Sequence, residues 1–357
     1  MKRKDKKTEK NASRGGWWVI LLNVAVIAVI AFFEFGRGER PQRIALRELR
    51  PLFLLEALGC FLIMLLSETW KYAWLLNATD HARPLHTGFR CAILGKYFDN
   101  ITPAGFGGQP FQIHYLKTQG CSDGTSGALP ILGFLGLQFT FVAVALAVFL
   151  LGGRMYRDLL TLKVAAWAGL ALYSFVPVCV VLFAIAPKAL ERIVSGGTRA
   201  LHRARILKDP EHSAKRAVEA LASYTDSVRY FSSRPRLLAA TVILSLIFRL
   251  AMLAMPWFVL RAFGARVSFP RCFCQVTYIY AVITLIPTPG NSGAAEASFY
   301  TVFSALSTGS VFWAMLVWRL LCYYSWLIGG AAHYIAQARF ARRPDRPVPE
   351  TDPPAGD

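Results

Sequence analysis

The stretch YFDNITPAGFGGQPFQIHYLKTQG at residues 97–120 decides the fold class, together with IPTPGNSGAAEASFYTVF at 286–303. In each, proline and glycine interrupt a short apolar segment. Proline removes a backbone donor and clashes with the preceding helical turn, whereas glycine tolerates the backbone angles of a reversal. Neither half of either segment is long enough to cross a bilayer. Each segment therefore predicts a helix–break–helix hairpin that re-enters the membrane.

Long apolar runs flank both hairpins. The chain has 357 residues, of which 55% are hydrophobic, and this is more apolar surface than one soluble core could bury. Runs long enough to span a hydrocarbon core lie at 17–35, 52–76, 127–151, 164–186, 237–260 and 311–336. The sequence therefore predicts an all-α, polytopic transmembrane helix bundle with about six full spans and two re-entrant hairpins.

The polar parts of the chain set the expected domain organisation and orientation. A basic cytoplasmic tail at 1–16 precedes a transmembrane domain at 17–341, and a tail at 342–357, rich in proline and charge, is expected to be disordered. An amphipathic loop at 187–236 should lie along the cytoplasmic surface. Together with the basic tail it predicts cytoplasmic N- and C-termini in a multi-pass protein of the inner or plasma membrane.

The net charge of +19 would suggest a nucleic-acid partner in a soluble protein. No phosphate-binding loop, RNA-binding signature or zinc finger accompanies it. Basic loops that hold the topology and rest against anionic lipid headgroups explain the charge better. We therefore expect membrane lipids, and no nucleic acid, as partners.

The two breaks occupy matching positions in two units of similar length. If the units are 52–151 and 237–336, Pro103 and Pro289 lie at nearly the same distance from the start of each. Hairpins that re-enter from opposite sides would make the units an inverted repeat. Non-helical backbone at membrane depth is tolerated only when it is buried in protein or lines a wet cavity. Broken helices at matching positions therefore predict a transporter-like binding cavity.

The first hairpin carries candidate groups for binding an anion. A cation at membrane depth is costly, so Lys96 should face a cavity, a carboxylate or a phosphate; alternatively it reaches water at the interface or pairs with Asp99. Gly107 and Gly108 precede an expected helix start near Pro110. The free N–H groups and the dipole of that helix would attract an anion, unless the glycines form only a tight structural turn.

The second hairpin carries a carboxylate. Glu296 is favoured at the start of the returning helix, and it could pair with Arg319 or with Arg249, either of which would be expensive unpaired in an apolar run. His114, in the first hairpin, could titrate or bind phosphate, or be only a hydrogen-bonded packing residue. The predicted substrate-binding residues are Lys96, Tyr97, Asn100, Gly107, Gly108, Gln109, His114, Pro289, Gly290, Asn291, Glu296 and Arg319.

Four stretches in order carry a family resemblance: 97–120 and 286–303 as quoted, SYTDSVRYFSSRPRLLAATVILSLIFRL at 223–250, and WRLLCYYSWLIGG at 318–330. Together they resemble the lysylphosphatidylglycerol synthase transmembrane region, or flippase-like domain, which is the membrane half of the multiple peptide resistance factor. The resemblance implies movement of lipids or lipid-linked headgroups between leaflets, without the aminoacyltransferase domain. The sequence has Gln109, Gln112 and Ala295 where the family often has charged residues, which leaves the headgroup open.

The leading hypothesis is a lipid transporter for an anionic or aminoacylated phospholipid or a lipid-linked headgroup. The first alternative is an intramembrane enzyme acting on a lipid-linked substrate, with acid and base groups from Glu296, His114 and Asp99. No nucleophile and base stand at motif spacing and no metal cluster is visible, so we assign no catalytic residue, metal or cofactor. The second alternative is a non-catalytic subunit of a lipid-modifying system. A homo-oligomer or a lipid-modifying enzyme is the expected protein partner.

Overall fold

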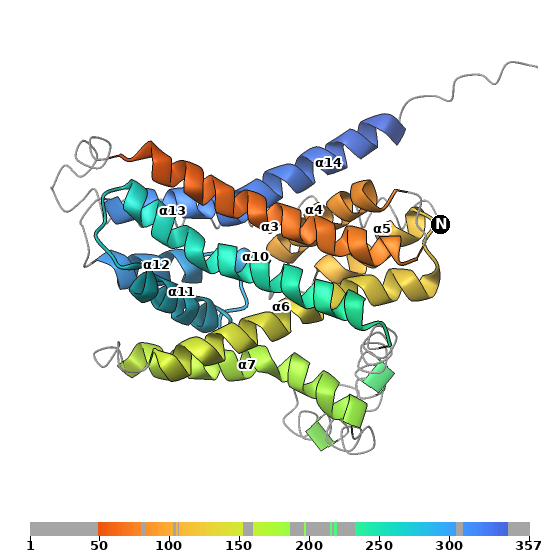
Figure 1. Cartoon of the computed structure of the whole chain (residues 1–357), viewed down its shortest axis with the longest axis horizontal. Helices are drawn as coiled ribbons and strands as arrows, with labels where there is room; N and C mark the ends of the chain where they lie inside the picture. Colours follow the sequence, from red (N-terminus) through yellow and green to blue (C-terminus); the bar gives the residue numbers. More distant parts are fainter. Residues whose placement is uncertain are drawn as a thin grey trace, which may run out of the picture.

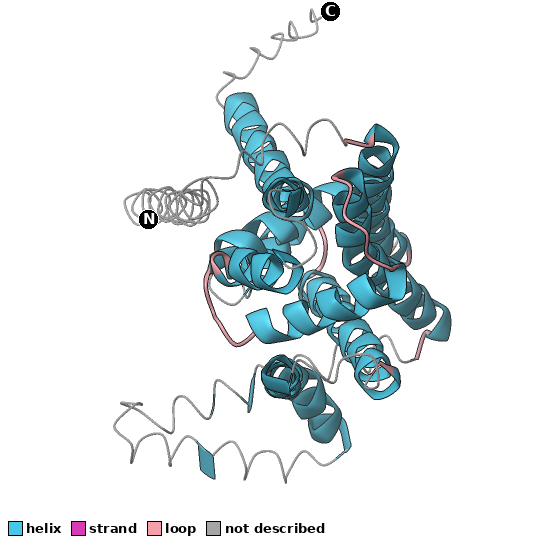
Figure 2. Cartoon of the chain, turned by 90° about the vertical axis from the view of Figure 1, so that its left-hand side faces the viewer, coloured by secondary structure: helices cyan, strands magenta, loops and turns pink. Residues whose placement is uncertain are grey.

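In the computed structural model, the described residues are 49–79, 83–102, 105, 107–152, 160–185, 233–304 and 310–341, with isolated positions between 196 and 219. Within these ranges every regular element is a helix, and short loops join the helices (Figure 2). The elements are α3 (Pro51–Asn77), α4 (Pro84–Ile101), α5 (Gly108–Thr118), α6 (Asp123–Leu151), α7 (Leu160–Ile185), α10 (Pro235–Ala262), α11 (Phe269–Ile283), the 3₁₀ turn η3 (Pro289–Asn291), α12 (Ala294–Phe303), α13 (Ser310–Arg319), the π turn η5 (Leu320–Tyr324) and α14 (Ser325–Ala341).

Four helices are long and apolar enough to cross a membrane: Pro51–Asn77, Asp123–Leu151, Pro235–Ala262 and Val311–His333. The predicted span at 164–186 corresponds to α7, which contains a shorter apolar stretch at Lys163–Cys179. The predicted span at 17–35, the basic tail, most of the loop at 187–236 and the tail at 342–357 lie outside the described residues. The prediction of a polytopic helical membrane protein is confirmed.

Helix α3 shows that this bundle is built for a bilayer. Leu66 and Trp70 are 53% and 58% exposed, whereas Glu68 and Lys71 are only 2% and 1% exposed. A soluble helix would place these groups the other way round, since charged side chains are almost never fully buried without a partner. Because the outer face of α3 is apolar and its inner face holds charges, the surrounding solvent must be lipid and the interior must supply polar partners.

The helix starts follow from proline positions. Pro51, Pro84 and Pro235 stand in the first turns of α3, α4 and α10, where the missing backbone N–H costs nothing and the fixed φ suits the helix. Helix α6 begins differently, since the Ser122 hydroxyl accepts a hydrogen bond from the Thr125 N–H at 3.2 Å.

The two broken hairpins approach the middle of the bundle from opposite ends. Helices α4 and α5 lie at one end in Figure 1, and α11 and α12 lie at the other. The returning helices α5 and α12 have 11 and 10 residues, which is too short to cross a bilayer. Helix α4 contacts η3, so the two breaks meet inside the protein. An inverted repeat requires this opposite placement, although the repeat units themselves stay a prediction.

Helices from both halves of the chain enclose the hairpins. Helix α3 packs along α10 and α4, α6 packs on α10 and α7, and α7 packs on α11 (Figure 1). Glycine allows the closest of these approaches: a Cβ atom on Gly169 of α7 would lie 1.9 Å from the carbonyl oxygen of Ala281 in α11. The second hairpin is therefore held directly against the backbone of α7.

Candidate functional site

A cavity of about 480 Å³ lies where the two hairpins meet. Its wall includes Lys96 and Asn100 from α4 and Gly290 and Asn291 from η3, so both breaks contribute to it. The rest of the wall comes from helices α3, α5, α6, α7, α10, α11, α12, α13 and α14, the π turn η5 and the loops beside the two breaks. The charged residues that line it are Glu68, Lys96, Asp99, Arg249 and Arg319.

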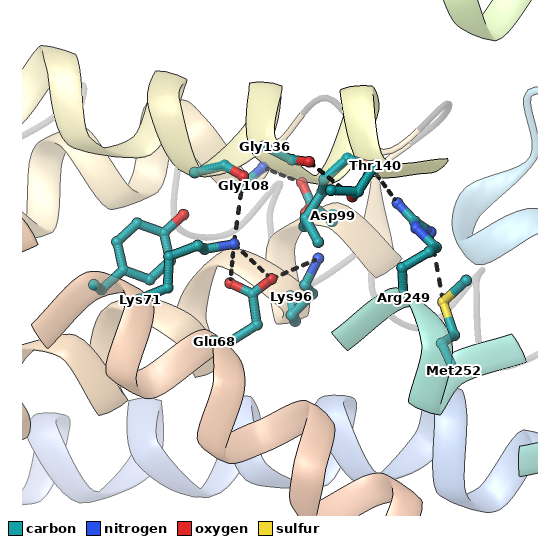
Figure 3. A network of polar contacts seen from close by, with 12 residues as sticks. Glu68, Lys71, Lys96, Asp99, Gly108, Gly136, Thr140, Arg249 and Met252 are labelled. Carbon is teal, nitrogen blue, oxygen red and sulfur yellow. Dashed lines mark hydrogen bonds and ion pairs between the residues drawn. The ribbon is translucent and has the colours of Figure 1, made fainter. Parts of the chain in front are cut away.

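The Glu68 carboxylate lies within 4 Å of two cations, Lys71 and Lys96, beside the first hairpin. Lys71 Nζ lies 2.9 Å and 2.8 Å from the two oxygens of Glu68 (Figure 3). It also donates to the carbonyl of Gly133 at 3.3 Å. Lys96 Nζ lies 3.9 Å from Glu68 Oε1 and 4.9 Å from the ring centre of Phe248. Lys71 is 1% exposed and Lys96 is 20% exposed. Lys71 is therefore ion-paired with Glu68, whereas the ammonium group of Lys96 has N–H donors available to a ligand in the cavity.

The N-terminus of α5 holds a protein carboxylate. The Gly108 N–H donates to Asp99 Oδ1 at 2.9 Å, and the Gly107 N–H donates to Thr102 Oγ1 at 2.9 Å. A Cβ atom on Gly108 would lie 2.4 Å from Asp99 Oδ1, so glycine is required for this approach. An anion does occupy the helix N-terminus, as its dipole favours, but here the anion belongs to the chain itself. Asp99 is consequently directed at α5, and Lys96 finds its carboxylate on α3.

Gln112 ties α5 to the rest of the first half. Its amide nitrogen donates to the Tyr72 hydroxyl and to the Cys91 carbonyl, each at 3.0 Å. A Cβ atom on Gly95 would lie 2.0 Å from this nitrogen, so α4 and α5 meet closely there. Gln112 and Gln109 are both buried.

A buried ion pair locks the second break. Arg319 Nε donates to Glu296 Oε1 at 2.5 Å, and the other oxygen of Glu296 accepts from the Gly293 N–H at 2.7 Å. The terminal nitrogens of Arg319 donate to the Gly290 carbonyl at 3.3 Å and 3.4 Å and to Ser292 Oγ at 3.3 Å. Arg319, rather than Arg249, is therefore the partner of Glu296. All three nitrogens of its guanidinium are used within the protein.

The loop held by this pair has a backbone that favours glycine. Gly290 has a φ of 59°, and its neighbour Asn291 has a φ of 53°. A Cβ atom on Gly290 would lie 2.0 Å from the ring of Tyr323 in the π turn η5. Single-turn π segments are frequent at functional sites, and this one places Tyr323 and Cys322 in the cavity wall.

The structure brings half of the predicted site residues to the cavity. Those that line it are Lys96, Asn100, Gln109, Gly290, Asn291 and Arg319. The others stand behind or away from it. Glu296 binds Arg319, and Gly107 and Gly108 form the turn before α5 and its first residue. Tyr97 packs against Gly330 of α14, and Pro289 is not part of the cavity wall. The side chain of His114 is exposed on α5.

The predicted substrate-binding set omitted three charged residues that line the cavity, Glu68, Asp99 and Arg249, and also Lys71, which pairs with Glu68. The signal was present, because ionisable residues inside apolar runs mark functional or paired positions. Glu68 and Lys71 are one helical turn apart in the run 52–76, and Arg249 stands in the middle of the run 237–260. No cluster of His, Cys, Asp or Glu that could hold a metal ion is present among the described residues.

These features define a class: a polytopic α-helical membrane protein whose two broken hairpins enclose a charged intramembrane cavity. Comparison with known families then identifies the group. The chain belongs to the family described as "Lysylphosphatidylglycerol synthase TM region", which matches residues 19–330. It is also similar to a "UPF0104 membrane protein" of Archaeoglobus fulgidus, with 23% identity over 314 residues, covering 87% of this chain and 94% of that protein. The family predicted from the sequence is confirmed.

Proposed function

We propose that this protein moves a lipid with an anionic headgroup between leaflets. The observation that carries the proposal is the composition of the cavity wall. Charged groups of α3, α4, α10 and α13 line its interior, whereas the apolar Leu172 and Phe175 of α7 also line it and are 53% and 65% exposed. A headgroup can therefore sit among the charges while its acyl chains remain in the bilayer past α7.

The opposed hairpins support alternating access. The two hairpins lie at opposite ends of the bundle (Figure 1), and residues of both breaks line the cavity. A movement of one hairpin against the other would therefore open the cavity to a single side at a time. This arrangement resembles transporters whose discontinuous helices meet at mid-membrane. A scaffold or accessory subunit would have no need of a charged cavity that reaches the lipid.

We further propose that the end of the bundle formed by the α4–α5 hairpin faces the cytoplasm of an inner or plasma membrane. Arg83, Arg90, Lys117, Arg234 and Arg236 stand at this end, compared with Arg50, Arg261, Arg266 and Arg271 at the other. Basic residues next to membrane spans are enriched on the cytoplasmic side. In this orientation the hairpin of α11 and α12 opens to the outside.

Reconstitution tests the proposal. The purified protein in vesicles with a trace of fluorescent phosphatidylglycerol should increase the fraction of label that an external quencher reaches beyond the outer-leaflet half. Lys96→Gln should slow this exchange about tenfold, because Lys96 offers free donors in the cavity. The matched control is Lys117→Gln, since Lys117 is 49% exposed on α5 and does not line the cavity. Exchange equal to that of protein-free vesicles, or equal exchange by both variants and wild type, would refute the proposal.

A further inference from the structure

Arg249 is a buried cation whose hydrogen-bonding capacity is only partly used. It lies in the middle of α10, is 7% exposed and lines the cavity (Figure 3). Its Nη2 donates to the Leu137 carbonyl at 2.9 Å and to the Tyr173 hydroxyl at 3.2 Å. Among the described residues, its Nη1 reaches only the sulfur of Met252 at 3.7 Å, a weak acceptor, and its Nε, which is enclosed by protein atoms, has no hydrogen-bond partner.

The other buried cations of the site are neutralised. Lys71 lies against Glu68 and Arg319 against Glu296, at ion-pair distance. Arg249 has no carboxylate within 4.0 Å in the part of the chain that the structure describes, and its neighbours are neutral dipoles and the face of Phe141 at 4.9 Å. A buried charge without a counter-charge is costly, more so at membrane depth. The arrangement is therefore one that an anion from outside the protein would complete.

The charge of that anion follows from the ionisable groups around the cavity. The described groups that line it or pair directly with its lining are four cations (Lys71, Lys96, Arg249, Arg319) and three anions (Glu68, Asp99, Glu296). One positive charge is in excess. A phosphodiester carries a single negative charge, whereas a phosphate monoester carries about 1.5 to 2 at neutral pH. A phosphodiester matches the excess and a monoester exceeds it.

We propose that Arg249 binds the phosphate of a phosphodiester lipid, with its weakly used Nη1 donor as the contact and Lys96 as the second cation. The inference rests on the proposed transport function in its choice of a lipid as the source of the phosphate. Glu68 and Asp99 remain in the wall as acceptors, so a headgroup that also presents donors finds partners there. Arg319 is excluded as the primary anion ligand, because its nitrogens already hold the second break.

Lipid binding measured by native mass spectrometry tests the proposal without requiring transport. The purified protein in neutral detergent is titrated separately with dioleoyl phosphatidylglycerol, dioleoyl phosphatidic acid, dioleoylglycerol and inorganic phosphate. We expect the phosphodiester to bind at least about tenfold more tightly than dioleoylglycerol and more tightly than the monoester. Arg249→Gln should abolish the preference over dioleoylglycerol, and Arg249→Lys should retain part of it. Arg236→Gln, an exposed position in the first turn of the same helix, should leave it unchanged.

The four titrations and the Arg249 variants distinguish a lipid phosphate site from the alternatives. Wild-type affinity for phosphatidylglycerol in a folded Arg249→Gln variant would overturn the proposal. If that variant does not fold, wild-type protein that binds dioleoylglycerol as tightly as phosphatidylglycerol overturns it equally. Tight binding of inorganic phosphate that displaces the phosphodiester would assign the site to free phosphate and overturn the lipid assignment. Binding that depends on Arg249 without any lipid exchange in vesicles would refute transport and leave this inference standing.

Discussion

Removal of the Glu296 carboxylate should destabilise the protein more than any surface change. Glu296 is 0% and Arg319 is 4% exposed. In Glu296→Ala, Arg319 loses its counter-charge and the Gly293 N–H loses its acceptor. Truncation of one partner of a buried ion pair costs about 3–5 kcal/mol, because the other charge stays buried. This is a large part of the roughly 5–15 kcal/mol by which proteins are typically stable.

A double-mutant cycle separates the pair from its surroundings. Arg319→Ala alone should cost a similar amount, and Glu296→Ala/Arg319→Ala should cost less than the sum of the two, because it leaves no unpaired charge. The free energy of unfolding can be followed by tryptophan fluorescence in mixed micelles of rising dodecyl sulfate content. Asp123→Ala is the control, since it removes an exposed pair with Lys117 and should change nothing measurable. Single variants as stable as wild type, or strictly additive losses, would refute the reasoning.

Two further predictions concern the break and the orientation. Gly290→Ala should lower the melting temperature and weaken headgroup binding, because φ is positive there and the new Cβ meets the Tyr323 ring. The control Gly59→Ala, whose Cβ has nothing within 4 Å, should leave the melting temperature unchanged. Equal melting curves for the two variants would contradict the rigid loop at Gly290. In a cysteine-free background, Thr118→Cys should react with an impermeant thiol reagent only from the cytoplasmic side, and Arg266→Cys only from outside. The reason is that these exposed positions lie at opposite ends of the bundle. Labelling with the reverse sidedness would refute the proposed orientation.

The sequence predicted the elements well because their causes are local. Apolar length predicted the spans, and the proline–glycine breaks predicted both hairpins. Several boundaries are shifted by a few residues: α6 begins at Asp123 rather than 127, α7 at Leu160 rather than 164, and α5 at Gly108 rather than near Pro110. The Asp99 carboxylate accepts from the Gly108 N–H and so extends the helix backwards.

The charge network was harder to predict from the sequence, because its interacting residues are far apart in the chain. Lys71 reaches the carbonyl of Gly133 across 62 residues, and Arg249 reaches that of Leu137 across 112. Helical spacing indicates which residues share a face, but it does not indicate which helix lies opposite. Spacing therefore offered Asp99 as a partner of Lys96, whereas the packing of α3 against α4 provides Glu68.

The position of α14 has a consequence for biogenesis. The first hairpin holds Lys96, Asp99 and a non-helical break, none of which can rest in lipid. Helix α4 packs on α3, which is synthesised before it, but also on α14, where Gly330 lies so close to Tyr97 that a Cβ atom would be 2.4 Å away. Because ribosomes make chains from the N-terminus, the covering of this hairpin is not finished until α14, the last of the described helices, has been translated. Until then the partly inserted chain must shelter the break by other means, such as the insertion machinery.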